Sequence, residues 1–159
     1  MTHSFSDSEN LCQSLEGLIG DEPDGLANLS NAAALLFMRL ADVNWAGFYL
    51  HKRGELVLGP FQGKPACIRI PLGSGVCGTA AQSGETFCVP DVHLFPGHIA
   101  CDGASASEIV VPLFRDGRLL GVMDIDSPVK ARFGDAERAV LEEFAGILSA
   151  RIRWSDLID

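Results

Sequence analysis

The apolar residues of this chain repeat with a helical period at both ends and with a strand period between them. Apolar side chains recur on one helical face over residues 11–19, again over 26–40, and a third time over 140–152. Residues 43–127 instead contain short apolar and aromatic runs that are bounded by glycine and charged residues, which is typical of strands. The chain therefore reads as two helices, a block of strands and a closing helix.

The helix ends carry recognisable signals. Ser6–Glu9 has the form of a capping box, and the break at residues 20–23 separates the first helix from a second that Asp24 can cap. Gly134 and Asp135 mark the start of the closing helix.

Six short strands are predicted, with one helix inserted among them. The glycine-rich stretch 73–78 opens this inserted helix, and Gly84 ends it. Short turns between neighbouring strands favour an antiparallel sheet, so we expect an α+β fold with helices packed on one face. The whole chain, 1–159, is expected to form one domain, with residues 1–24 as an N-terminal helix and extension. The expected strands span residues 44–50, 55–58, 67–71, 86–89, 108–114 and 119–127.

The charge balance limits the class of partner. Twelve Lys and Arg against twenty-one Asp and Glu give a formal net charge of −9, which repels phosphate backbones and anionic lipid. No apolar run approaches the roughly 20 residues needed to cross a bilayer. The N-terminus lacks the basic and apolar regions of a secretory signal, so a cytoplasmic protein that binds neither nucleic acid nor membrane is expected.

The five cysteines are odd in number, and none forms a C-x-x-C pair. Their spacing does not match a structural zinc site, so no metal is expected. Cys12 lies on the apolar face of the first helix, and Cys88 lies within a strand, so both are interpreted as packing residues. The remaining cysteines either pack in the core or meet in space for redox chemistry.

The segment 90–106 is the longest irregular stretch, and connections of this length are uncommon unless functional. It contains Cys101, which a loop would leave accessible enough to act as a nucleophile. His98 is close enough in sequence to assist, although a loop histidine is more often simply solvated.

Two carboxylates stand out inside the last strand. Asp124 and Asp126 project from one face, about 7 Å apart, while Met123 and Ile125 project from the other. A three-residue hairpin loop at 115–117 would place Glu108 opposite Asp124, whereas a two-residue turn would place Glu108 on the other face. In the first register three carboxylates converge. The alternative is an exposed acidic face.

Such a carboxylate cluster could bind a substrate ammonium, and crowding would raise at least one carboxyl pKa so that it can donate a proton. Trp45 and Tyr49 share one face of their strand, and the small Gly47 between them could leave room for a ligand.

Six runs occur in order along the chain: NWAGFYL from Asn44, LGPFQGKPAC from Leu58, IPLGSGVCGTA from Ile70, DVHLFPGHIACD from Asp91, SEIVVPL from Ser107 and GVMDIDS from Gly121. These runs closely resemble the free methionine-(R)-sulfoxide reductases, a family built on a GAF domain, and the likeness extends from residue 28 to 148. Many GAF domains only sense small molecules, and the cysteines and carboxylates distinguish the enzymes from these sensors.

The resemblance implies a role for three of the cysteines. Cys101 matches the attacking thiolate, Cys67 the principal resolving cysteine, and Cys77 a further cysteine able to join the disulfide relay. Cys12 and Cys88 fall outside the pattern of the family and receive no role.

The resemblance also implies a substrate pocket. Glu108, Asp124 and Asp126 match the positions that hold the amino acid and polarise the sulfoxide, with Glu108 or Asp126 as the proton donor. Trp45 and Tyr49 match the pocket for the terminal methyl group. The backbone of residues 98–101, including His98 and Ile99, would face the substrate carboxylate.

The implied activity is the reduction of free L-methionine-(R)-S-oxide through a cysteine sulfenic acid and an intramolecular disulfide, with thioredoxin as the external reductant and no metal or organic cofactor. The resemblance also allows a homodimer. The alternative is a non-catalytic GAF module that binds a small molecule or senses redox state.

Overall fold

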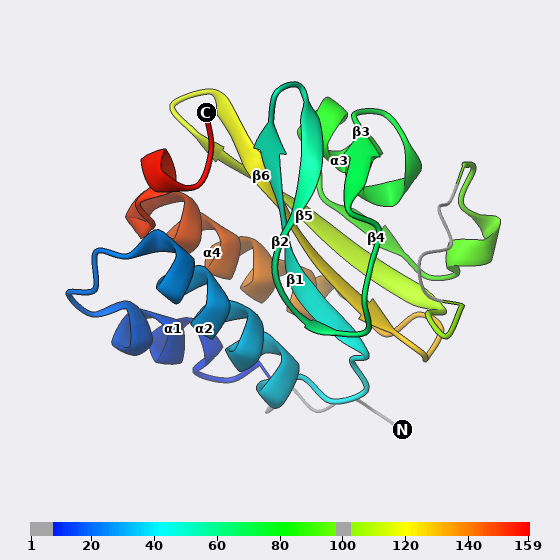
Figure 1. Cartoon of the computed structure of the whole chain (residues 1–159). Coiled ribbons are helices and arrows are strands. Elements are labelled where there is room, and N and C mark those ends of the chain that lie inside the picture. Colours follow the sequence, from blue (N-terminus) through cyan, green and yellow to red (C-terminus); the bar gives the residue numbers. More distant parts are fainter. Residues whose placement is uncertain (1–7, 98–102) are drawn as a thin grey trace.

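The computed structural model describes residues 8–97 and 103–159. Their centre is a six-stranded antiparallel sheet with the order β3-β2-β1-β6-β5-β4 (Figure 1). Each expected strand is present, although β2 is longer than predicted. The strands are β1 (Trp45–Lys52), β2 (Glu55–Gly63), β3 (Arg69–Pro71), β4 (Phe87–Val89), β5 (Ser107–Arg115) and β6 (Arg118–Ser127).

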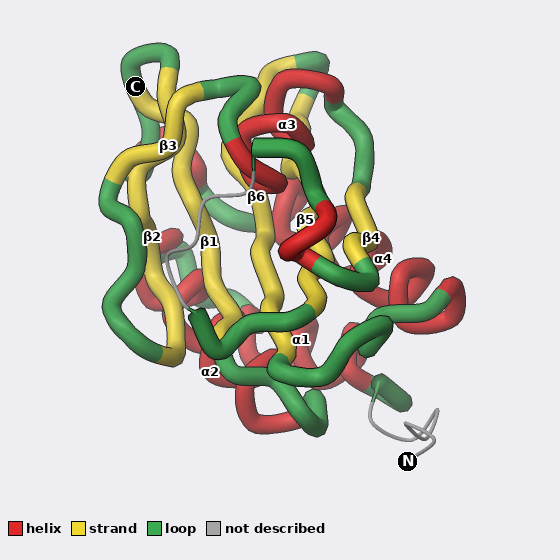
Figure 2. Tube along the Cα trace, turned by 90° about the vertical axis from the view of Figure 1, so that its right-hand side faces the viewer, coloured by secondary structure: helices red, strands yellow, loops and turns green. Residues whose placement is uncertain are grey.

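Helices cover both faces of this sheet. The helices α1 (Leu11–Ile19), α2 (Gly25–Arg39) and α4 (Asp135–Arg151) pack on one face, while α3 (Gly75–Ser83) lies on the other (Figure 2). The predicted α+β architecture is therefore confirmed, with the difference that α3 does not share the face of the other helices. The described part of the chain also contains two short 3-10 helices, η2 (Val92–Leu94) and η3 (Trp154–Asp156).

The helix ends follow the predicted signals with one exception. The Asp24 carboxylate accepts a hydrogen bond from the Ala27 amide at 2.9 Å and so caps α2, and Gly84 ends α3 in a left-handed conformation. The first helix begins later than the capping box at Ser6–Glu9 predicted, because Asn10 is its N-terminal flanking residue with φ of 61°. Ser6 itself lies outside the described residues.

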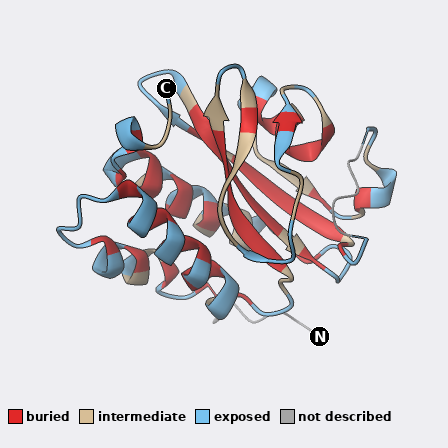
Figure 3. Cartoon of the chain, viewed as in Figure 1, coloured by how far each residue is buried: buried red, intermediate tan, exposed pale blue. Residues whose placement is uncertain are grey.

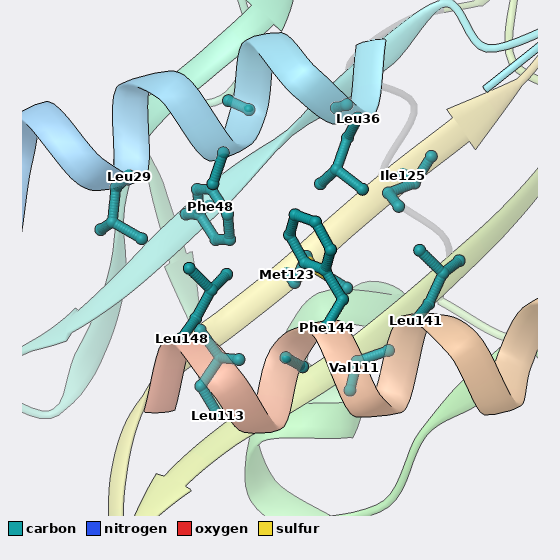
Figure 4. Close-up of a cluster of buried hydrophobic side chains, with 14 of the residues drawn as sticks. Leu29, Leu36, Phe48, Val111, Leu113, Met123, Ile125, Leu141, Phe144 and Leu148 are labelled. Carbon is teal, nitrogen blue, oxygen red and sulfur yellow. The ribbon is translucent and has the colours of Figure 1, made fainter. Parts of the chain in front are cut away.

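The main hydrophobic core fills the space between the sheet and the three-helix layer (Figure 4). Phe48 of β1, Met123 of β6 and Phe144 of α4 are fully buried there, and Ile125, which was predicted to share a strand face with Met123, belongs to the same cluster. The central strands β1, β5 and β6 are buried along most of their length, whereas the outer faces of the helices are exposed (Figure 3). A smaller apolar cluster on the opposite face joins α3 to the sheet.

The hairpin of β5 and β6 has a register that the sequence did not predict. Asp116 and Gly117, with φ of 51° and 76°, form a two-residue turn. Between this turn and the centre of the sheet, the pairing shifts by one residue: Phe114 pairs with Leu119, but Leu113 pairs with Gly121. This β-bulge reverses the faces of the remaining residues, and it puts Glu108 opposite Asp126.

Gly121 allows the bulged strand to approach β1. A Cβ atom at this position would lie 2.2 Å from the backbone oxygen of Tyr49, which cannot move without breaking the pairing of β1 with β6. Within the described ranges, none of the helices has the length and apolar composition needed to span a membrane.

We expect Gly121→Ala to lower the free energy of unfolding by about 2 kcal/mol or more, since the added methyl group overpacks rigid backbone. The midpoint of urea unfolding measures the effect. Gly146→Ala in α4 is the matched control, because a Cβ there meets nothing within 4 Å. This control is expected to be neutral or stabilising by up to about 1 kcal/mol. Equal midpoints for the two variants would contradict the proposed constraint.

Candidate functional site

A pocket lies on the sheet face that carries α3. It encloses about 570 Å³, counting the space that is open to solvent. Strands β1, β5 and β6 form its floor, and the start of α3 and the segment after β2 form its walls. The pocket is lined by Trp45, Tyr49, Pro65, Ala66, Ile70, Ser74, Gly75, Val76, Cys77, Ser105, Glu108, Asp124 and Asp126.

The three predicted carboxylates all line this pocket. Glu108 and Asp124 are only 6% and 5% exposed, while Asp126 is half-buried. Their convergence was predicted for a three-residue loop, and that premise is wrong, because the loop has two residues and the bulge restores the shared face. The partner across the hairpin also differs from the prediction, since Glu108 pairs with Asp126 and not with Asp124. The exposed acidic face is excluded.

Burial and mutual repulsion favour the protonated forms of Glu108 and Asp124. Loss of hydration, followed by the charge of Asp124, raises the pKa of Glu108 well above its usual value. Burial and then the charge of Asp126 raise the pKa of Asp124. The Oδ1 atom of Asp124 is fully buried and has no hydrogen-bond partner among the described residues. The cluster can therefore both release a proton and accept a hydrogen bond from a cation.

Cys77 contacts the cluster from the first turn of α3. Its side chain is buried, and its Sγ donates to Oε2 of Glu108 at 3.9 Å. Burial and the charges of Asp124 and Glu108 raise the pKa of the Cys77 thiol well above its usual value. Cys77 is thus held as a neutral free thiol in this state. Cys77, Glu108 and Asp124 could together supply three ligand atoms to a metal ion.

Cys67 directly follows the pocket-lining residue Ala66 and is disulfide-bonded. Cys12, Cys77 and Cys88 are free, so none of them is its partner. Cys12 and Cys88 are half-buried against the helix-layer core, away from the pocket, as their interpretation as packing residues predicted.

The two predicted pocket aromatics hold the segment that contains Cys67. The hydroxyl of Tyr49 donates to the backbone oxygen of Cys67 at 2.9 Å, and Nε1 of Trp45 donates to the backbone oxygen of Lys64 at 3.1 Å. The rings of Trp45 and Tyr49 are stacked with centroids 6.0 Å apart. The aromatic pair therefore forms one wall of the pocket and also ties the Cys67 segment to the sheet.

The sequence suggested that the small Gly47 leaves room for a ligand, and this prediction is wrong. A Cβ at Gly47 would lie 2.3 Å from the Cβ of Phe61, so the space above this glycine is filled by β2. Phe61 in turn stacks on Trp45, with centroids 5.2 Å apart. The role of Phe61 could not be predicted from the sequence, because it depends on the pairing of β1 with β2.

Three predicted site residues, His98, Ile99 and Cys101, lie outside the described residues. The chain that follows them is anchored beside the pocket, because the Ala106 amide donates to the backbone oxygen of Ser127 at 2.7 Å. Ser105 lines the pocket and was missed by sequence analysis. Asn44 was also missed: its Nδ2 is 3.5 Å from Ser105 Oγ. Asn44 is the first residue of a matching run, and Ser105 lies between two such runs, but neither residue has a further signal in the sequence.

The chain is similar to known proteins over most of its length. The GAF domain family matches residues 25–152. Protein YtsP of Bacillus subtilis is 56% identical over 144 residues, which cover 89% of this chain and 88% of the relative. Free methionine-R-sulfoxide reductase of Escherichia coli is 49% identical over 147 residues, which cover 92% and 89% of the two chains.

A solved structure of fRMsr of Staphylococcus aureus in complex with its substrate has a TM-score of 0.89 to this chain at 47% identity. The match covers 96% of this chain and 99% of the Staphylococcus protein. The GAF family matches most of the chain, and relatives at about 50% sequence identity are covered over nearly their whole length. Both findings show the family of this chain. This chain belongs to the GAF domain family and, within it, to the free methionine-R-sulfoxide reductases.

Proposed function

We propose that this protein reduces free L-methionine-(R)-S-oxide to L-methionine. The observation that carries the proposal is one pocket in which buried carboxylates face an aromatic wall, in a member of this family. The carboxylates suit an ammonium and a sulfoxide oxygen, and the rings of Trp45 and Tyr49 suit a methyl thioether group.

The buried carboxylates account for selectivity toward the free amino acid. The unpartnered Oδ1 of Asp124 accepts a hydrogen bond from the substrate ammonium. A methionine sulfoxide within a polypeptide has no such ammonium at its α-nitrogen, so this buried oxygen would stay unpaired.

The raised pKa of Glu108 supports a role in proton transfer. A protonated Glu108 or Asp126 donates a proton to the sulfoxide oxygen while the thiolate of Cys101 attacks the sulfur. The oxygen passes to Cys101 as a sulfenic acid, and methionine leaves. Cys67 then attacks the sulfenic sulfur, which forms a disulfide and releases water. The dithiol of thioredoxin reduces this disulfide by exchange.

Two observations favour Cys67 over Cys77 as the resolving cysteine. Cys67 is already in disulfide linkage, whereas Cys77 is a free and buried thiol. A thiol attacks as its thiolate, and the burial and neighbouring carboxylates of Cys77 disfavour that form. Cys77 can join the relay only after it has moved away from Glu108. The cycle needs a compartment in which thioredoxin is kept reduced, and the cytoplasm meets that need.

The first test is NADPH oxidation in the presence of thioredoxin and its reductase. Free L-methionine-(R)-S-oxide, the free (S) form and a peptide-bound sulfoxide are offered separately, with all thiols reduced at the start. We expect turnover with the free (R) form alone. An absence of turnover with all three substrates would favour the non-catalytic GAF ligand-binding module.

Cysteine variants test the assignment of the relay. Cys101→Ser is expected to abolish methionine formation, because the substitution removes the thiolate that is proposed to attack the sulfur. Cys67→Ser should release about one methionine per protein and then stall, since its sulfenic acid has no partner to form a disulfide. Rapid-quench measurement of methionine distinguishes these outcomes. Cys88→Ser is the control and should recycle normally; recycling by Cys101→Ser would refute the assignment.

Asp124→Asn is expected to raise KM and, at about pH 8, to raise the free energy of unfolding. Asn cannot ionise against the substrate ammonium as the Asp124 carboxyl can, so the substitution should raise KM about 10- to 100-fold, as expected for a hydrogen bond to a charged group. The folded protein retains protons on its buried carboxyls that the unfolded chain releases. Wild-type stability therefore falls as pH rises from about 4 toward the raised pKa of Asp124.

The variant lacks this penalty, so its urea midpoint should exceed that of the wild type at about pH 8 and approach it at about pH 4. Asp116→Asn in the exposed turn is the matched control, with unchanged KM and no pH-dependent difference in midpoint. A lower midpoint for Asp124→Asn at the higher pH would contradict the energetic role assigned to this carboxylate.

A further inference from the structure

Cys77, Glu108 and Asp124 place one sulfur and two carboxylate oxygens in a single buried group. The three donor atoms all lie within 4.8 Å of one another. These residues come from α3, β5 and β6, so no local sequence spacing brings them together. The group also faces the pocket, which gives an ion a route from solvent.

The spacing of these atoms is close to that of a tetrahedral metal site. Typical zinc–sulfur and zinc–oxygen bonds of about 2.3 Å and 2.1 Å imply a sulfur-to-oxygen distance of about 3.6 Å. The Sγ of Cys77 and Oε2 of Glu108 are 3.9 Å apart. Small side-chain adjustments would therefore suffice to complete three ligand positions.

A second observation points independently to a cationic ligand. The Oδ1 atom of Asp124 is buried in the pocket wall and has no hydrogen-bond partner among the described residues. A buried carboxylate oxygen without a partner is costly, and a cation would relieve that cost.

We propose that Cys77, Glu108 and Asp124 bind a borderline-soft divalent cation, Zn²⁺ or its spectroscopic substitute Co²⁺, with a water in the fourth position. A thiolate with two carboxylates suits these ions better than Mg²⁺ or Ca²⁺, which prefer all-oxygen sites. Binding forms one metal–sulfur bond and two metal–oxygen bonds, and it releases to solvent the thiol proton and any protons that the two carboxyl groups hold, with no change of oxidation state. The ion is a reversible inhibitor and not a cofactor of the reaction.

Inhibition follows because the ion occupies carboxylates that the substrate also needs. This consequence rests on the proposed function, whereas metal binding itself does not. The two are separated by measuring binding directly on the protein in which Cys67 is disulfide-bonded. In that form Cys67 cannot act as a ligand, and the thiols of Cys12, Cys77 and Cys88 are free.

The test is a titration of this oxidised protein with Co²⁺, monitored by the thiolate-to-cobalt charge-transfer absorption. We expect a saturable band that Zn²⁺ removes and excess Mg²⁺ does not. Cys77→Ser should lose the band, while Cys88→Ser, the matched control with a half-buried thiol on the far face of the sheet, should keep it. Absence of the band in the wild type, or its retention in Cys77→Ser, would overturn the proposal.

Asp124→Asn keeps the thiol and tests the site without changing Cys77. Its cobalt affinity should fall by more than about tenfold, given that even outer-shell partners contribute about 10- to 100-fold. An unchanged affinity would overturn the proposed ligand set. Free methionine sulfoxide is expected to weaken cobalt binding in the wild type. If it does not, while the cysteine variants behave as expected, the metal site stands and the shared use of the carboxylates is refuted.

Discussion

The pairing of β5 with β6 is the constraint on which the pocket depends. A two-residue turn alone would place Glu108 opposite Ile125, on the face that packs against the helices. The β-bulge near Leu113 shifts the register by one residue, and Glu108 then faces the pocket with Asp124 and Asp126. Burial of this shared face by α3 and by the aromatic wall produces the raised carboxyl pKa values. The proposed chemistry depends on that burial.

The two faces of the sheet serve different purposes. The helix-layer face is packed with apolar side chains such as Phe48 and Phe144, which supply most of the hydrophobic stabilisation. The other face buries the carboxyl groups of Glu108 and Asp124 and the thiol of Cys77, and removing these polar groups from water costs free energy. The stabilisation from the large core on one face thus offsets the free-energy cost of burying polar groups on the other face. Such local costs are common at functional sites.

Much of this arrangement could be predicted from the sequence, because it depends on local periodicity. Alternation within one strand places Asp124 and Asp126 on one face and Met123 and Ile125 on the other, and the structure agrees. The same alternation puts Trp45 and Tyr49 together. The roles of Gly47 and Phe61 were not predictable, because they depend on the pairing of β1 with β2, which places Phe61 opposite Gly47. The side of the sheet on which α3 packs was likewise not predictable, because its apolar residues fit either face.

The sequence by itself determined the order of helices and strands, the side chains that share a strand face, and the family to which the chain belongs. These properties follow from short-range periodicity and from motifs that are read in order along the chain. Only the tertiary structure decided which carboxylate lies opposite Glu108, that Cys77 is a buried neutral thiol beside it, and that Tyr49 holds the Cys67 segment. Each of these depends on contacts between strands or helices distant in sequence, where a one-residue shift in register reverses the face of every side chain.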